Sequence, residues 1–261
     1  MAVSELDALF LKTLEDDYDD DEPWKAVHTL RKLGTPEVFD RAVEWCRSSN
    51  GSQRARGVDI LAQLGSGGDA ETIESFQMRA LPIILELLEK EKAALPVVSA
   101  ISALGHLSLP AAIPMIVSYT KHFDPDVRYA VAFALGSFAD DQRSIEALLT
   151  LMKDDDHEIR DWATFSLCSL GDADNKEVRA ALTDALNDDD EDVWLEAAIG
   201  LGRRRDRQAA EPLEAILNDD PSNGPAREAA KLLLGFEETS DVEVEKSLSA
   251  LRNMQAWGKT R

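Results

Sequence analysis

Four histidines and two cysteines are the side chains of this sequence best suited to nucleophilic catalysis or metal binding. The histidines are scattered, and none has a His or Cys neighbour at metal-ligand spacing: His28, His106, His122 and His157. Cys46 and Cys168 form no CxxC pair, and Cys168 lies in an apolar helical run typical of a core residue. We therefore predict no catalytic residue, no metal site and no cofactor.

The acidic run from Asp188 to Asp192 is the remaining candidate for cation chemistry. It lacks the glycine and the spaced glutamate of an EF-hand calcium loop. Aspartates before a helix accept hydrogen bonds from its free N–H groups and oppose the positive end of its dipole. We interpret this run as a solvated helix cap.

Three consecutive arginines form a basic knot in an otherwise acidic chain: Arg203, Arg204 and Arg205. Guanidinium groups bind carboxylates and phosphates through paired hydrogen bonds, so the knot is a candidate partner-binding site. The alternative is structural, because arginines at the end of a helix complement its dipole and the neighbouring aspartates.

Two tryptophans near the starts of consecutive predicted helices are the other candidate partner-binding residues. Trp162 falls on the apolar face of its helix, whereas Trp194 lies one residue off that face and is expected to be partly exposed. Exposed tryptophans often anchor protein partners. The alternative is that both rings pack between neighbouring helices.

The charge balance restricts the class of partner. Asp and Glu number 50 against 28 Lys and Arg, giving a formal net charge of -22. This sign disfavours nucleic acids and anionic membranes and favours a basic protein. No apolar run approaches the length of a membrane span, and Met1 to Phe10 lacks the pattern of a signal peptide, so we expect a cytoplasmic protein.

One helical sequence pattern recurs seven times along the chain. Its copies begin at positions 22, 53, 93, 127, 159, 193 and 226, and offsets 0, 3, 4, 7, 8 and 11 of each copy lie on one helix face, where apolar residues predominate. Offset 4 is always small or β-branched: Ala26, Gly57, Val97, Val131, Ala163, Ala197 and Ala230. Offset 8 is always Leu or Ile: Leu30, Leu61, Ile101, Leu135, Leu167, Leu201 and Leu234.

A second apolar helix follows each copy, so the sequence predicts two-helix units with a period in the low thirties. Such units must stack to cover their apolar faces, which predicts an all-α solenoid over residues 22–261. The one spacing of 40 coincides with a predicted flexible insertion at residues 66–69. Pro82, Pro114 and Pro212 are expected near the starts of second helices. Residues 1–21 are expected to form a capping helix and an acidic linker.

The segment from Asp126 to Gly136 resembles the first helix of a HEAT-like repeat, and more narrowly the short repeats shared with phycobilisome lyases. His157 to Arg160 opens the next copy in the same way, whereas Trp194 stands where that pattern has arginine. The resemblance implies that second helices line a concave, partner-binding face. We expect Arg128 and Arg160 to pair with the acidic turns of neighbouring repeats.

Three functions remain open at this point. The preferred hypothesis is a non-enzymatic protein-interaction module, acting as a scaffold, adaptor or inhibitor of a basic protein. By resemblance alone, the chain could instead be a lyase-like or other enzymatic subunit. The third hypothesis is a DNA mimic or nucleic-acid-associated protein, because one branch of these repeats acts on DNA.

Overall fold

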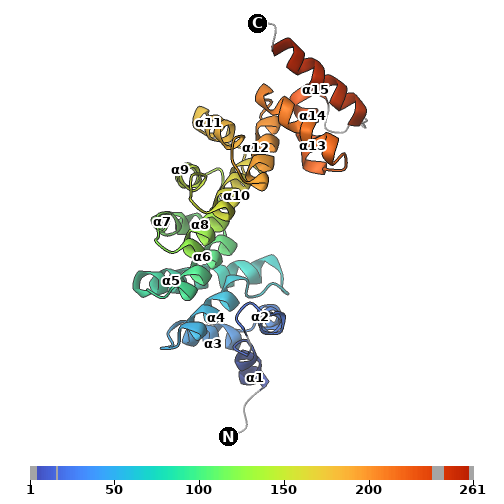
Figure 1. Ribbon diagram of the computed structural model, residues 1–261. Coiled ribbons are helices and arrows are strands. Elements are labelled where there is room, and N and C mark those ends of the chain that lie inside the picture. The colour runs from blue at the N-terminus through green and yellow to red at the C-terminus, as the bar shows by residue number, and fades with distance from the viewer. Residues whose placement is uncertain (1–4, 16, 237–243, 259–261) are drawn as a thin grey trace. The chain divides into compact units, whose positions relative to one another are not determined.

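The computed structural model describes residues 5–15, 17–236 and 244–258, and these ranges contain helices and no β-strand (Figure 1). A short helix, α1 (Glu5–Lys12), precedes the repeats. The first helices of the repeats are α2 (Asp21–Leu33), α4 (Gly51–Ala62), α6 (Ala94–Leu107), α8 (Pro125–Gly136), α10 (His157–Phe165), α12 (Glu191–Arg203) and α14 (Gly224–Leu234). The second helices are α3 (Pro36–Cys46), α5 (Ala70–Lys90), α7 (Ile113–Ser118), α9 (Gln142–Leu151), α11 (Lys176–Ala185), α13 (Ala210–Asp219) and α15 (Val244–Gly258). The predicted all-α solenoid of two-helix repeats is confirmed.

Aspartate caps fix where the first helices of the middle repeats begin. The carboxylates of Asp124, Asp156 and Asp190 each accept a hydrogen bond from a backbone N–H two residues later. These bonds satisfy N–H groups that have no partner within the helix. The acidic turns therefore cap helices, as the sequence predicted.

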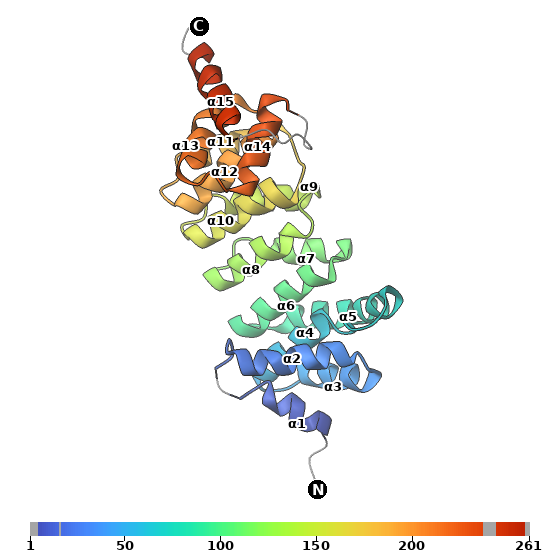
Figure 2. The ribbon, with the colours of Figure 1, turned by 90° about the vertical axis from the view of Figure 1, so that its right-hand side faces the viewer.

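Two compact units make up the chain, residues 1–138 and residues 139–261. In the first unit α4 packs against α2, α3 and α6, and α6 packs against α8. In the second unit α12 packs against α10, α11 and α14, and α13 packs against α15 (Figure 2). Each unit is thus a stack of helix pairs in which first helices contact first helices.

The predicted register places the core correctly. The offset-4 residues are buried in every repeat, which lets neighbouring first helices approach closely. The offset-8 residues are buried in the first six repeats, from Leu30 to Leu201. The seventh repeat differs, because Leu233 is buried there and Leu234 is half-buried. There α14 packs on α15 as well as on α12 and α13, and Leu233 supplies the buried leucine.

The expected place of Pro82 is wrong. Pro114 and Pro212 lie in the first turns of α7 and α13, but Pro82 lies in the interior of α5. That helix begins at Ala70, capped by Asp69, and runs for 21 residues. The long spacing between the second and third repeats is thus accommodated by a longer helix following a short turn. A buried apolar face at Phe76, Ala80 and Ile84 holds the helix together across the proline.

A buried polar network fastens the N-terminal segment to the second repeat. The guanidinium of Arg56, which is fully buried, donates to the backbone oxygens of Thr13 and Tyr18 and to the carboxylate of Asp59. The Tyr18 hydroxyl donates to the same carboxylate and lies 3.0 Å from the Ser99 hydroxyl. In addition, α1 packs on α2. The role of residues 1–21 as a cap stays a prediction.

No helix in the described ranges is long and apolar enough to cross a lipid bilayer.

Candidate functional site

Trp194 occupies a repeat position that arginine fills in four other repeats: Arg54, Arg128, Arg160 and Arg227. Where the structure shows its bonds, this arginine holds the turn before its own helix. Arg54 donates to the backbone oxygen of Ser48 at 2.9 Å, and Arg160 donates to that of Asp154 at 3.1 Å. An indole cannot form these hydrogen bonds to the turn. The Trp194 side chain lines two cavities instead.

Two adjoining cavities meet at Trp194. The larger, about 670 Å³, lies between α11 and α13, and the smaller, about 380 Å³, extends toward the start of α14. Trp194 and Ala215 line both cavities, and Leu186, Leu195, Pro212 and Ile216 add apolar walls. We call the two cavities together the Trp194 groove.

Carboxylates dominate the rim of the Trp194 groove. Its acidic lining residues are Glu191, Glu211, Asp219 and Asp220, all exposed, and no Lys or Arg lines either cavity. Hydrogen bonds from Ser222 hold the pKa of Asp220 below its ordinary value, so that carboxylate stays charged. An apolar floor inside an anionic rim suits an apolar side chain flanked by lysine or arginine.

Trp162 is placed apart from this groove. Its half-buried ring lies on α10 and forms a T-shaped pair with the Phe165 ring, at 5.6 Å between centroids. Trp162 is not among the residues that line the two cavities at Trp194. Its predicted role in partner binding stays a prediction.

Two of the three consecutive arginines bind the protein's own backbone. Arg204 donates to the carbonyl oxygens of Leu167 at 2.7 Å and Ala173 at 2.9 Å, and Arg203 donates to that of Cys168 at 2.9 Å. These oxygens lie in and after a single π-helical turn, Ser166–Leu170, that ends the first helix of the fifth repeat. Such a turn leaves carbonyl groups without helical partners, and the guanidinium groups satisfy them.

Arg205 is the member of the knot left facing solvent. Its backbone adopts the left-handed conformation with φ of 55°, and its side chain is exposed. The predicted capture of a partner's anion by Arg203, Arg204 and Arg205 stays a prediction, and in this arrangement Arg205 is the arginine exposed for it.

The cysteines are poorly suited to nucleophilic chemistry. Burial raises the pKa of the Cys46 and Cys168 thiols to about 12, so both stay protonated at neutral pH. Among the described residues, no group of three or more His, Cys, Asp and Glu side chains is placed to hold a metal ion.

Sequence reasoning identified Trp194 but missed the second-helix residues that complete the groove. Pro212, Ala215 and Asp219 are separated from Trp194 by about a helix and a turn and carry no motif. One signal was available: in the sixth repeat tryptophan replaces the arginine found in four others, and this position lines the groove.

The comparisons agree on the repeat architecture. Residues 81–168 and 169–235 match the family described as HEAT repeats. The sequence is 29% identical over 211 residues to protein YibA of Escherichia coli strain K12, covering 76% of this chain and 72% of YibA. The X-ray structure of E. coli YibA matches with a TM-score of 0.69 at 25% identity, over 94% of this chain and 92% of that one. An engineered protein matches with a TM-score of 0.54 at 21% identity, over 84% of this chain and 96% of that one.

Proposed function

The chain belongs to the HEAT repeat family, and we propose that it is a protein-interaction module that binds a basic segment of a partner in the Trp194 groove. The observation that carries this proposal is the half-buried indole that lines the groove at a position where four other repeats have an arginine. A tryptophan in a concave, partly apolar site is a typical anchor of protein interfaces.

The groove defines the chemistry of the segment. An apolar side chain would enter between α11 and α13 and contact the indole of Trp194, Leu186 and Pro212. Lysine or arginine residues on either side of it would face Glu211 and Asp219 at the rim. The net charge of -22 adds a long-range attraction that speeds the encounter and weakens with salt.

The test is a selection of short random peptides on the wild-type protein, with removal of those that also bind Trp194→Arg. That variant introduces the arginine found at this position in four other repeats, so its fold should be preserved, as a circular dichroism melt would check. We expect peptides with one large apolar residue beside at least two basic residues. Fluorescence polarisation should show binding weakened at least about tenfold by Trp194→Arg, the loss typical of an interface anchor.

Salt dependence and two control variants complete the test. Raising the salt concentration from about 50 to about 300 mM should lower the affinity of the peptides several-fold, because the charges at the rim are screened. Trp162→Phe and Arg205→Glu should leave the affinity unchanged; a loss in either would move the site to that residue. Peptides without basic residues, or equal affinity for Trp194→Arg, would contradict the proposal. A chromophore that copurifies with the protein would favour the lyase-like alternative.

A further inference from the structure

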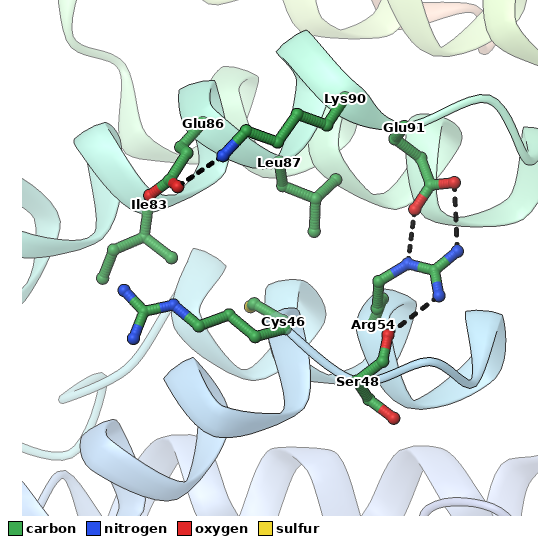
Figure 3. Close-up of a pocket in the computed structure, with 9 residues that line it drawn as sticks. Cys46, Ser48, Arg54, Ile83, Glu86, Leu87, Lys90 and Glu91 are labelled. Atoms are coloured by element: carbon green, nitrogen blue, oxygen red, sulfur yellow. Dashed lines mark hydrogen bonds and ion pairs between the residues drawn. The ribbon is translucent and has the colours of Figure 1, made fainter.

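A second pocket lies between α3 and α5, at the place in the second repeat that corresponds to the Trp194 groove in the sixth (Figure 3). Its volume is about 370 Å³. Cys46, Arg47 and Ser48 line one side, and the last turns of α5 line the other, with Arg54 at the position equivalent to Trp194. We call it the Arg47 pocket. Its polarity is opposite to that of the Trp194 groove, because three cationic residues line it beside two carboxylates.

One ion pair of this pocket is closed to a ligand. Arg54 donates from Nε to Oε2 of Glu91 at 2.5 Å and from Nη2 to Oε1 at 3.0 Å, and it also holds the Ser48 carbonyl oxygen. The Glu91 side chain is only 7% exposed. A two-bonded, largely buried pair of this kind is part of the repeat's own structure.

The other charged side chains of the Arg47 pocket are accessible to a ligand. Lys90 and Glu86 form an ion pair of 2.7 Å whose side chains are 69% and 54% exposed, so it exchanges readily with water and ions. Arg47 is exposed, and within the described residues its guanidinium has no hydrogen bond or ion pair. The Lys90 hydrogen bond, with a smaller contribution from Arg47, holds the pKa of Glu86 below its ordinary value. Two accessible cations therefore line the pocket, and only Lys90 is paired with the exposed carboxylate of Glu86.

Apolar side chains lie between the accessible charged residues and the buried Arg54–Glu91 ion pair. Leu87 is largely buried and projects into the pocket between Lys90 and Arg54, and Ile83, one turn earlier in α5, also lines the pocket (Figure 3). A bound group thus meets aliphatic carbon on one side and a cation on the other. That pairing suits a short aliphatic stem ending in a carboxylate.

We infer that the Arg47 pocket binds the side-chain carboxylate of a glutamate in a partner polypeptide, through Arg47 and Lys90, with an aliphatic neighbour against Ile83 and Leu87. The Arg47 pocket and the Trp194 groove share no residue and lie in different compact units. This inference and the proposed function can therefore fail independently. The net charge of -22 repels acidic chains at a distance, but beyond about 8 Å that field is screened at physiological ionic strength. The local cations therefore decide binding once the segment has docked.

The experiment observes isoleucine methyl groups of the full chain by NMR during titration with a capped tripeptide, acetyl-Leu-Glu-Leu-amide. We expect a saturable shift of the Ile83 methyl signal, while Ile216, in the Trp194 groove, stays unchanged. The glutamine analogue should bind at least about fivefold more weakly, because it lacks the charge. Arg47→Ala should weaken the glutamate peptide about tenfold.

Matched controls make the outcome decisive. Arg41→Ala changes an arginine of α3, the helix that Arg47 directly follows. Arg41 pairs with Asp7 and Glu44 outside the pocket, so this variant should bind like the wild type. Equal affinities for the glutamate and glutamine peptides, or no effect of Arg47→Ala, would overturn the inference. So would tighter binding of inorganic phosphate at Ile83, or binding of a glutamine peptide that carries only a free C-terminal carboxylate.

Discussion

Arg160 and Asp188 form a two-bonded ion pair that joins the first helix of the fifth repeat to the turn that opens the sixth. Nε donates to Oδ2 at 2.8 Å, and Nη2 donates to Oδ1 at 2.7 Å. Both side chains are less than 15% exposed. The inter-repeat pairing expected of Arg160 is confirmed, and Arg54 does the same with Glu91 in the N-terminal unit.

Removing this link should loosen the C-terminal unit. Arg160→Ala leaves Asp188 without its guanidinium, and we expect a loss of about 1.5–3 kcal/mol in the free energy of unfolding, the range for hydrogen bonds to charged groups. Urea unfolding followed by circular dichroism measures it. Arg143→Ala, which breaks an exposed pair with Asp141, should change the stability by no more than a few tenths of a kcal/mol.

The stability that the Arg160–Asp188 ion pair contributes should decrease as the pH falls. The Arg160 hydrogen bond holds the pKa of Asp188 below its ordinary value near 3.8. A carboxylate whose pKa is lower in the folded state contributes stability above that ordinary value and loses it as pH falls through the folded pKa. The stability difference between wild type and Arg160→Ala should therefore shrink below about pH 4. A difference that grows in acid would contradict this assignment.

Gly200→Ala should destabilise the contact between the fifth and sixth repeats. An added Cβ would clash with Sγ of Cys168 and lie 3.0 Å from its Cβ. Overpacking of this kind costs about 1–3 kcal/mol. Cys168→Ala in the same chain should recover part of the loss, which a double-mutant cycle of urea midpoints would show. Gly224→Ala is the control, since nothing lies within 4 Å of the added carbon.

Arg56→Met should be the most damaging change of an arginine in the N-terminal unit. The guanidinium is fully buried, stacks 3.6 Å from the Tyr18 ring centroid and pairs with Asp59. Its removal leaves a buried carboxylate with less compensation and frees the segment at Thr13, at a cost of about 3–5 kcal/mol. Arg56→Lys should recover little, because an ammonium group cannot reach all three acceptors. Thermal melts and hydrogen exchange of residues 13–18 measure both effects.

Glu196 should make the protein less stable as pH rises toward neutrality. Burial, with the charges of Asp161 and Asp192, raises the pKa of Glu196 from 4.5 to about 7. The folded state therefore holds this proton more tightly than the unfolded chain does. The resulting stability is fully present below about pH 4.5 and is lost as pH rises through about 7.

The glutamine variant isolates that effect. Glu196→Gln keeps the shape and cannot ionise, so its melting temperature should fall less than that of the wild type between about pH 5 and about pH 8. Parallel pH profiles for the two proteins would show that Glu196 is not the group responsible.

Local patterns in the sequence were sufficient for the helices and their register. Offsets of 3, 4, 7 and 8 define one helix face, and an aspartate such as Asp190 caps the helix that follows it. These features depend on residues a few positions apart in the sequence, so a recurring sequence pattern predicts them repeat by repeat. The seven repeats and the buried leucines up to Leu201 could be derived in this way. The pairing of Arg160 with Asp188, 28 residues away, followed from the repeat period, which brings the next acidic turn beside each first helix.

Tertiary packing alone decided the features that depend on residues distant in the chain. Pro82 is held inside α5 by the buried face of that helix, although its backbone preference favours a helix start. Arg204 binds carbonyl oxygens that are free only because the preceding first helix ends in a π turn. Trp194 lines a groove only because α13 passes beside α11, and Arg47 lines a pocket only because α5 passes beside α3. The sequence by itself determines which surfaces each helix must bury, but the cavities between second helices arise when the repeats stack.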